Sequence, residues 1–166
     1  MNTGQTIFVL GAFALLGTTI LSLHRSLGNS NQVVIQSKLG VTAVSLASSI
    51  VEEASGKAFD KNTDEDIATL TSQLTSVVNL GLETGESYPD STNDFDDFNN
   101  LNRTISPDTL SGTFNIRCKV NYINPSTPDV AQSSPTWHKK LTISVTSPQM
   151  KDTVKAEYIF SYWYFR

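Results

Sequence analysis

The first 23 residues contain no charged side chain, and this feature most limits what the chain can fold into. As an α-helix, the segment would be about 34 Å long, which matches a bilayer hydrocarbon core of about 30 Å. A helix that is apolar on every side needs apolar surroundings on every side. Three interpretations compete: a cleaved secretory signal, a membrane anchor, and a helix that sits first in a membrane and later in a protein filament.

The sequence gives little support to a cleaved signal. No basic side chain precedes His24, and Leu21-Ser22-Leu23 does not have the small-x-small pattern of a cleavage site. Small residues such as Gly11 and Gly17 would let helices approach closely in an apolar setting. In the filament interpretation, the side chains expected at the interface between subunits are Gln5, Ile7, Phe8, Val9, Leu10, Phe13, Leu15, Leu16, Ile20 and Leu21.

A second helical pattern follows the apolar segment. Residues 26–31 are weak helix formers and indicate a break, a kink or a loosened turn. Gly56 is a plausible stop, so residues 2–55 form one long helix or two nearly collinear ones. One stripe of this second half is expected to pack on the rest of the chain, through Ile35, Leu39, Ala43, Leu46 and Ile50.

Residues 60–97 are strongly acidic, with ten Asp or Glu against one Lys, a net charge of −9. Ser, Thr, Asn and Gly are frequent there and favour turns and loops. Residues 64–78 nevertheless have apolar side chains at helical spacing, which predicts a short helix within this acidic loop region, residues 60–100.

From about residue 101 the apolar pattern changes to a period of two. Strands are predicted near residues 102–105, 114–122, 137–145 and 154–165. The expected fold is α+β: a long N-terminal helix, half protruding and apolar and half amphipathic, packed on a three- or four-stranded antiparallel meander. The expected division is an apolar helix of residues 1–27 and a globular head of residues 28–166, which together give a ladle-like shape.

This organisation resembles the type IV pilin and pseudopilin superfamily. Residues 43–53, AVSLASSIVEE, look like the A-x-x-L-A-x-x-x-x-E-E stretch of minor pilins and pseudopilins. Residues 94–99, DFDDFN, are similar to an acidic, aromatic loop of minor pilins. The family normally carries a glutamate at the fifth mature position, whereas this chain has Gln5, whose neutral amide can accept a hydrogen bond from an amine without neutralising it.

The resemblance implies a non-enzymatic structural protein that polymerises into an extracellular, pilus-like filament. Its partners would be further copies of itself, the pilus or secretion assembly machinery, and the inner membrane before assembly. Two alternatives remain: a minor pseudopilin of a secretion or pilus machine, and a membrane-anchored surface binding protein. The formal net charge of −4 argues against nucleic-acid binding.

Calcium is the one cofactor that the sequence suggests. Oxygen-rich side chains lie close together in the acidic loop, and Ca²⁺ takes six to eight oxygen ligands. Some pseudopilins carry such a site in this region, although the spacing here is not that of an EF-hand. The alternative is a solvated acidic loop without a metal. The candidate ligands are Asp90, Asp94, Asp96, Asp97 and Asn99.

Overall fold

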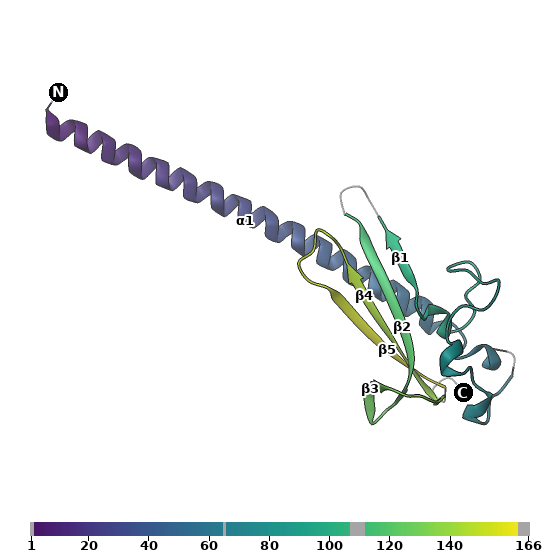
Figure 1. Cartoon of the computed structure of the whole chain (residues 1–166). Coiled ribbons are helices and arrows are strands. Elements are labelled where there is room, and N and C mark those ends of the chain that lie inside the picture. The colour runs from purple at the N-terminus through teal and green to yellow at the C-terminus, as the bar shows by residue number, and fades with distance from the viewer. Residues whose placement is uncertain (1, 65, 107–111, 163–166) are drawn as a thin grey trace. The chain divides into compact units, whose positions relative to one another are not determined.

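The protein is an α+β protein with one long N-terminal helix and an open antiparallel sheet of five strands (Figure 1). The computed structural model describes residues 2–64, 66–106 and 112–162. The chain falls into two compact units, Met1–Lys38 and Leu39–Arg166. This division differs from the predicted boundary between residues 27 and 28, which stays a prediction.

Helix α1 (Thr3–Ser55) is 53 residues long and continues without interruption through residues 26–31. Of the two predicted alternatives, one long helix is therefore the one observed. Weak helix formers cost at most about 1 kcal/mol each, whereas extending an existing helix adds one hydrogen bond per residue. The helix ends just before Gly56, as predicted. The amides of Gly56 and Lys57 donate to carbonyls three residues earlier, Glu53 and Ala54, both at 3.3 Å.

In the unit Leu39–Arg166, one stripe of α1 is buried in the core. Its fully buried members are Leu39, Ala43, Ala47, Ile50 and Ala54, and Leu46 is partly buried against them. The predicted stripe also included Ile35, but that side chain is 56% exposed. Ile35 is exposed because it lies one helical turn before the compact unit that begins at Leu39.

The sheet is built from five strands, and every pairing is antiparallel. The strand order is β1-β2-β4-β5, and β3 lies off this path and pairs with β2. The bounds are β1 Asn102–Ile105, β2 Phe114–Asn124, β3 Thr127–Ala131, β4 His138–Thr146 and β5 Val154–Ser161. Strand β3 was not predicted, because Pro125 and Pro128 read as the end of a strand. It forms a short hairpin in which Pro128 lies on an edge, where a missing N–H is tolerated.

The period-two pattern of β2 and β4 places one face of the sheet in the core. Phe114, Ile116, Val120, Leu141 and Ile143 are all at most 1% exposed. The last strand ends at Ser161 rather than at residue 165, and residues 163–165 lie outside the described part of the chain.

The predicted helix over residues 64–78 is wrong. The described residues there form the short 3₁₀ turns η2 (Thr71–Gln73) and η3 (Val77–Asn79), preceded by η1 (Lys61–Thr63). Side chains replace the helical bonds, because Oε1 of Gln73 accepts the amide hydrogens of Thr69 and Leu70 at 2.8 and 2.9 Å. Such local side-chain bonds compete directly with helix formation.

Candidate functional site

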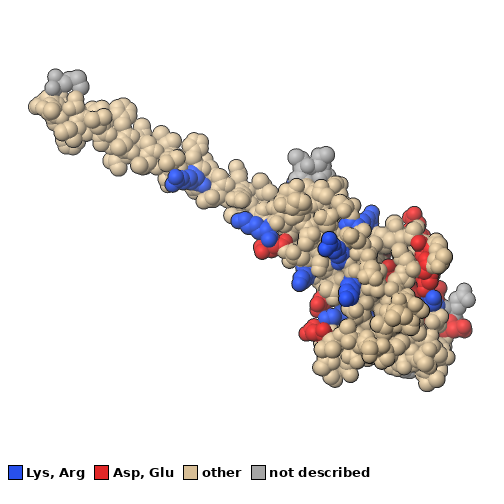
Figure 2. Space-filling view, in the orientation of Figure 1, with Lys and Arg blue, Asp and Glu red and all other residues tan. Residues whose placement is uncertain are grey.

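The first candidate site is the apolar surface of α1 within the unit Met1–Lys38. The nine apolar side chains predicted at the interface are between 49% and 82% exposed, and Gln5 is exposed as well. Ile7, Phe8, Val9 and Leu10 are consecutive and therefore cover the full circumference of a helix with 3.6 residues per turn. Figure 2 shows the N-terminal end of this helix without charged side chains.

Three threonine hydroxyl groups within this apolar surface donate to carbonyl oxygens of the helix itself. Thr6 donates to the carbonyl oxygen of Thr3 at 2.8 Å, Thr18 to Leu15 at 2.9 Å, and Thr19 to Leu16 at 2.8 Å. A hydroxyl that already has a partner can enter an apolar environment at much lower cost. These three threonines can therefore enter apolar surroundings together with the hydrophobic side chains around them.

The same helix meets the length and composition of a membrane span. It contains an 18-residue window with a mean hydropathy of 2.1, no part of which is buried. A membrane and an apolar protein environment would therefore both satisfy this surface.

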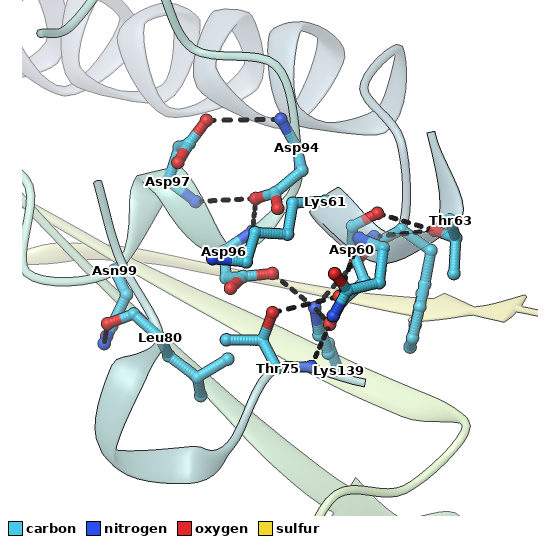
Figure 3. Close-up of polar contacts among 12 residues, drawn as sticks. Asp60, Lys61, Thr63, Thr75, Leu80, Asp94, Asp96, Asp97, Asn99 and Lys139 are labelled. Carbon is cyan, nitrogen blue, oxygen red and sulfur yellow. Dashed lines mark hydrogen bonds and ion pairs between the residues drawn. The ribbon is translucent and has the colours of Figure 1, made fainter. Parts of the chain in front are cut away.

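The second candidate site is a buried ion cluster in the unit Leu39–Arg166 (Figure 3). Lys139 of β4 contacts carboxylates of Asp60, which precedes η1, and of Asp96 in η4 (Asp96–Phe98). All three side chains are 0% exposed. The Lys139 Nζ lies 2.9 Å from Oδ2 of Asp60, contacts Oδ1 of Asp96, and donates to the carbonyl oxygen of Phe59 at 2.7 Å. Each of its three hydrogens therefore has an acceptor.

The pKa values of the two carboxyls that contact Lys139 are shifted in opposite directions. Burial raises the pKa of Asp60, but attraction to Lys139 and hydrogen bonds outweigh burial and leave this pKa below its usual value. For Asp96, burial outweighs Lys139, and the pKa is raised. Asp60 is thus the ionised partner of Lys139, and Asp96 is the carboxyl that more readily holds a proton.

Three of the predicted calcium ligands form hydrogen bonds with other groups of the protein. Oδ1 of Asp94 accepts the amide hydrogens of Asp96 and Asp97 at 2.9 and 3.2 Å, and Oδ2 of Asp97 accepts that of Asp94 at 3.2 Å (Figure 3). Asn99 donates to the carbonyl oxygen of Leu80 at 2.9 Å. Its side-chain oxygen accepts the amide hydrogen of Val120 at 3.0 Å.

The other two predicted ligands lie in different surroundings. Asp96 faces Lys139, and Asp90 is exposed. Among the described residues, the carboxylates of Asp97, Glu83 and Glu86 lie close together, and each offers an oxygen within 4.8 Å of the others. Calcium binding by the five predicted residues stays a prediction, and only Asp97 belongs to both sets.

Sequence reasoning missed the Lys139 cluster, although a signal was present. In the predicted strand near residues 137–145, Leu141, Ile143 and Val145 alternate with polar residues, and a period of two places Lys139 on the same face as these three. In the pairing of β2 with β4, Lys139 lies opposite Tyr122, which is also buried. A lysine in phase with a buried apolar row needs a carboxylate partner, and the acidic region 60–97 could supply one.

The molecule is therefore an α+β protein in which the C-terminal part of a long N-terminal helix packs on an antiparallel sheet, and in which the N-terminal part of that helix has an exposed apolar surface. Comparison with protein-family models, with curated proteins and with solved structures found no match.

Proposed function

We propose that this chain is a structural subunit that polymerises into an extracellular, pilus-like filament through the N-terminal half of α1. One observation carries the proposal: apolar side chains are exposed around the full circumference of the helix near Ile7–Leu10. Such a surface is satisfied when several neighbouring helices surround it, and copies of the same helix can supply them. Contacts of this head-to-tail kind, when they do not close into a ring, produce an open helical polymer.

The fold supports this proposal because it is compatible with a pilin-like architecture. Residues of α1 from Leu39 to Ala54 pack on an antiparallel sheet and leave the earlier residues of the helix outside that core. In the proposed life cycle, the apolar half is held in the inner membrane before assembly. The pilus or secretion assembly machinery then transfers it to the filament at the cell surface.

The span-like hydropathy of α1 favours a second candidate function, a membrane-anchored surface binding protein. In that case lipid, and not other subunits, would cover Ile7–Leu10 in the working state. A minor pseudopilin, which primes or tips a secretion or pilus machine, would use the same helix contacts at low copy number. Material sheared from the cell surface separates these alternatives, because a major subunit dominates that fraction.

The decisive test is a charge placed within the apolar surface. Leu16→Asp in the full chain should abolish filaments in negative-stain electron microscopy, because an unpaired carboxylate in apolar surroundings costs several kcal/mol, roughly 3 or more. Phe13→Asp should act in the same way. The matched control is Val130→Asp on β3, which adds the same charge at a side chain that is 56% exposed and should leave filaments intact.

Two outcomes would overturn the proposal. One is a normal filament from both Leu16→Asp and Phe13→Asp. The other is a wild-type chain that stays monomeric in bilayers and forms no fibres under any assembly condition, which would favour the anchor. Circular dichroism and thermal unfolding of each variant establish that the unit Leu39–Arg166 remains folded.

A further inference from the structure

The Lys139 cluster brings an amine and two carboxyls together in a site without solvent access. The side chains of Lys139, Asp60 and Asp96 are 0% exposed and come from three separate segments of the chain (Figure 3). Aromatic rings form part of the wall, since Nζ of Lys139 lies 4.7 Å from the ring centre of Phe59 and 5.3 Å from that of Tyr122. Such a site excludes water and strengthens electrostatic interactions.

The two carboxyls are held in unequal ways. Both oxygens of Asp60 are fully used: Oδ1 accepts from the Thr75 hydroxyl at 2.9 Å and from the Asn62 amide at 3.2 Å, and Oδ2 accepts from the Thr75 amide and from Lys139, both at 2.9 Å. Asp96 contacts Lys139 through Oδ1, whereas its Oδ2 is buried and has no hydrogen-bond partner among the described residues. Asp60 is thus held by hydrogen bonds to both of its oxygens, whereas Asp96 has a partner at one oxygen only among the described residues.

An unsatisfied buried carboxylate beside a buried ammonium is costly, because both ions have lost their water. Asp94 adds to this cost, since it is also buried and has one oxygen, Oδ2, without a hydrogen-bond partner in the described part of the chain. Joining the amine to the carboxyl would replace two buried ions by one neutral amide.

We propose that Lys139 and Asp96 condense into an intramolecular isopeptide bond, with Asp60 as the group that transfers the proton. The bond joins Nζ of Lys139 to Cγ of Asp96 and releases one water molecule. The product is a covalent link between β4 and η4 across 43 positions of the sequence. No metal, cofactor or second enzyme is required.

The reaction balances with the groups present. Lys139 gives one proton to Asp96 through their direct contact, and the neutral amine attacks Cγ of the carboxylic acid. A second proton passes from nitrogen to Asp60, which delivers it to the leaving hydroxyl group as the Cγ–O bond breaks. One ammonium and one carboxylate become one amide N–H and one water, the net charge of the three groups stays at −1, and nothing is oxidised or reduced.

The environment favours attack by the amine and keeps the proton acceptor in its ionised form. Burial raises the pKa of Asp96, which favours the acid form that an amine can attack. The lowered pKa of Asp60 keeps it ionised and able to take the proton. Fixed neighbours can react with effective concentrations of roughly 10⁵ to 10⁸ M, and a dry site opposes the reverse hydrolysis. After the reaction, the remaining N–H still has the carbonyl oxygen of Phe59 or Oδ2 of Asp60 as its acceptor.

Mass spectrometry of the full chain, purified in detergent and denatured, tests the bond directly. We expect a mass lower than that of the sequence by one water molecule. Tryptic digestion locates the loss: a linked Lys139 blocks cleavage after that residue, so peptide 120–140 should be joined to peptide 62–103, which carries Asp96. A link to Asp60 would instead involve peptide 58–61. A chain of full sequence mass, or a link to peptide 58–61, would overturn the proposal.

Three variants refine the test. Lys139→Arg keeps the positive charge but has no amine nucleophile, so the cross-linked peptide should disappear. Asp60→Asn leaves both reacting groups in place and should reduce linkage at least tenfold, since the proton acceptor is lost; linkage at the wild-type level would refute its role.

Lys140→Arg is the matched control, because the neighbouring Lys140 pairs with Asp129 at 3.0 Å and lies outside the cluster. It should link like the wild type. The wild-type mass decides the proposal even if a variant fails to fold. The result is also independent of filament formation, because the bond lies within a single chain.

Discussion

The hydroxyl of Tyr122 donates to the main-chain oxygen of Thr75 at 2.8 Å, and so joins the buried face of β2 to a segment without regular secondary structure. The same hydroxyl lies 3.1 Å from Oδ2 of Asp60. Residues 60–80 contain only 3₁₀ turns among their described positions, so their attachment to the sheet depends on such side-chain contacts.

Tyr122→Phe should therefore destabilise the protein. The substitution leaves the buried carbonyl oxygen of Thr75 without its donor, which typically costs about 1–3 kcal/mol. Urea unfolding followed by tryptophan fluorescence measures the loss. Tyr158→Phe is the control, because no side-chain hydrogen bond joins Tyr158 to the described residues. Equal stability of Tyr122→Phe and the wild type would show that this hydroxyl does not hold the segment.

The contact between α1 and the sheet depends on small side chains. Ala43 is 0% exposed and faces the core, so Ala43→Leu adds volume where no space exists. We expect a loss of about 1–3 kcal/mol in the free energy of unfolding from overpacking. Thermal unfolding gives the measurement, and Ser48→Leu on the exposed side of the same helix should change little. A fully tolerated leucine at position 43 would mean that the helix does not pack closely there.

Gln73 holds a turn where the sequence predicted a helix. Its Oε1 accepts the amide hydrogens of Thr69 and Leu70, so Gln73→Ala should expose both amides to solvent exchange. Hydrogen exchange should become several-fold faster at these two residues, with a loss of about 1 kcal/mol in local stability. Gln73→Glu keeps an acceptor oxygen and should retain the protection. Unchanged exchange in Gln73→Ala would show that other contacts maintain the turn.

The sequence predicted the α+β fold because its main elements have strong periodicity. The uncharged N-terminal segment and the stripe at Leu39, Ala43 and Ile50 indicated a long helix with two kinds of surface, and alternation in residues 114–122 indicated an inward-facing strand. These patterns depend on local geometry alone, so they can be recognised in a single amino-acid sequence. Residues 64–78 were misassigned because apolar spacing there suggested a helix, whereas the oxygen of Gln73 favoured turns.

The charge cluster was harder to predict, since it joins residues far apart in the sequence. Lys139 and Asp96 are 43 positions apart, and no local pattern states which of ten acidic residues in 60–97 meets the lysine. The pattern in β4 indicated only that Lys139 points inward. The partner is fixed by the pairing of β2 with β4 and by the path of the irregular segment, which are tertiary properties.

Asp94 should make the stability of the folded protein depend on pH. In the unlinked chain, burial, followed by repulsion from Asp96, raises its pKa from 3.8 to about 8, against the opposing attraction of Lys139; burial, the largest cause, acts in the linked chain as well. Between these two values the folded state holds a proton that the unfolded state lacks. The Asp94 contribution to the free energy of unfolding therefore falls as pH rises from about 4 to about 8, by roughly 1 kcal/mol per pH unit. Above this range the buried carboxylate is ionised, and the full loss of stability remains.

Asp94→Asn should remove this dependence, because an amide does not ionise and its oxygen can still accept the amide hydrogens of Asp96 and Asp97. The free energy of unfolding, measured in urea at several pH values, should show the variant gaining on the wild type between pH 4 and pH 8, the window set by the two pKa values. Asp90→Asn removes the same charge from an exposed side chain and should follow the wild type. Parallel pH profiles for Asp94→Asn and the wild type would refute the raised pKa, because the difference between the two profiles isolates the titration of this one group.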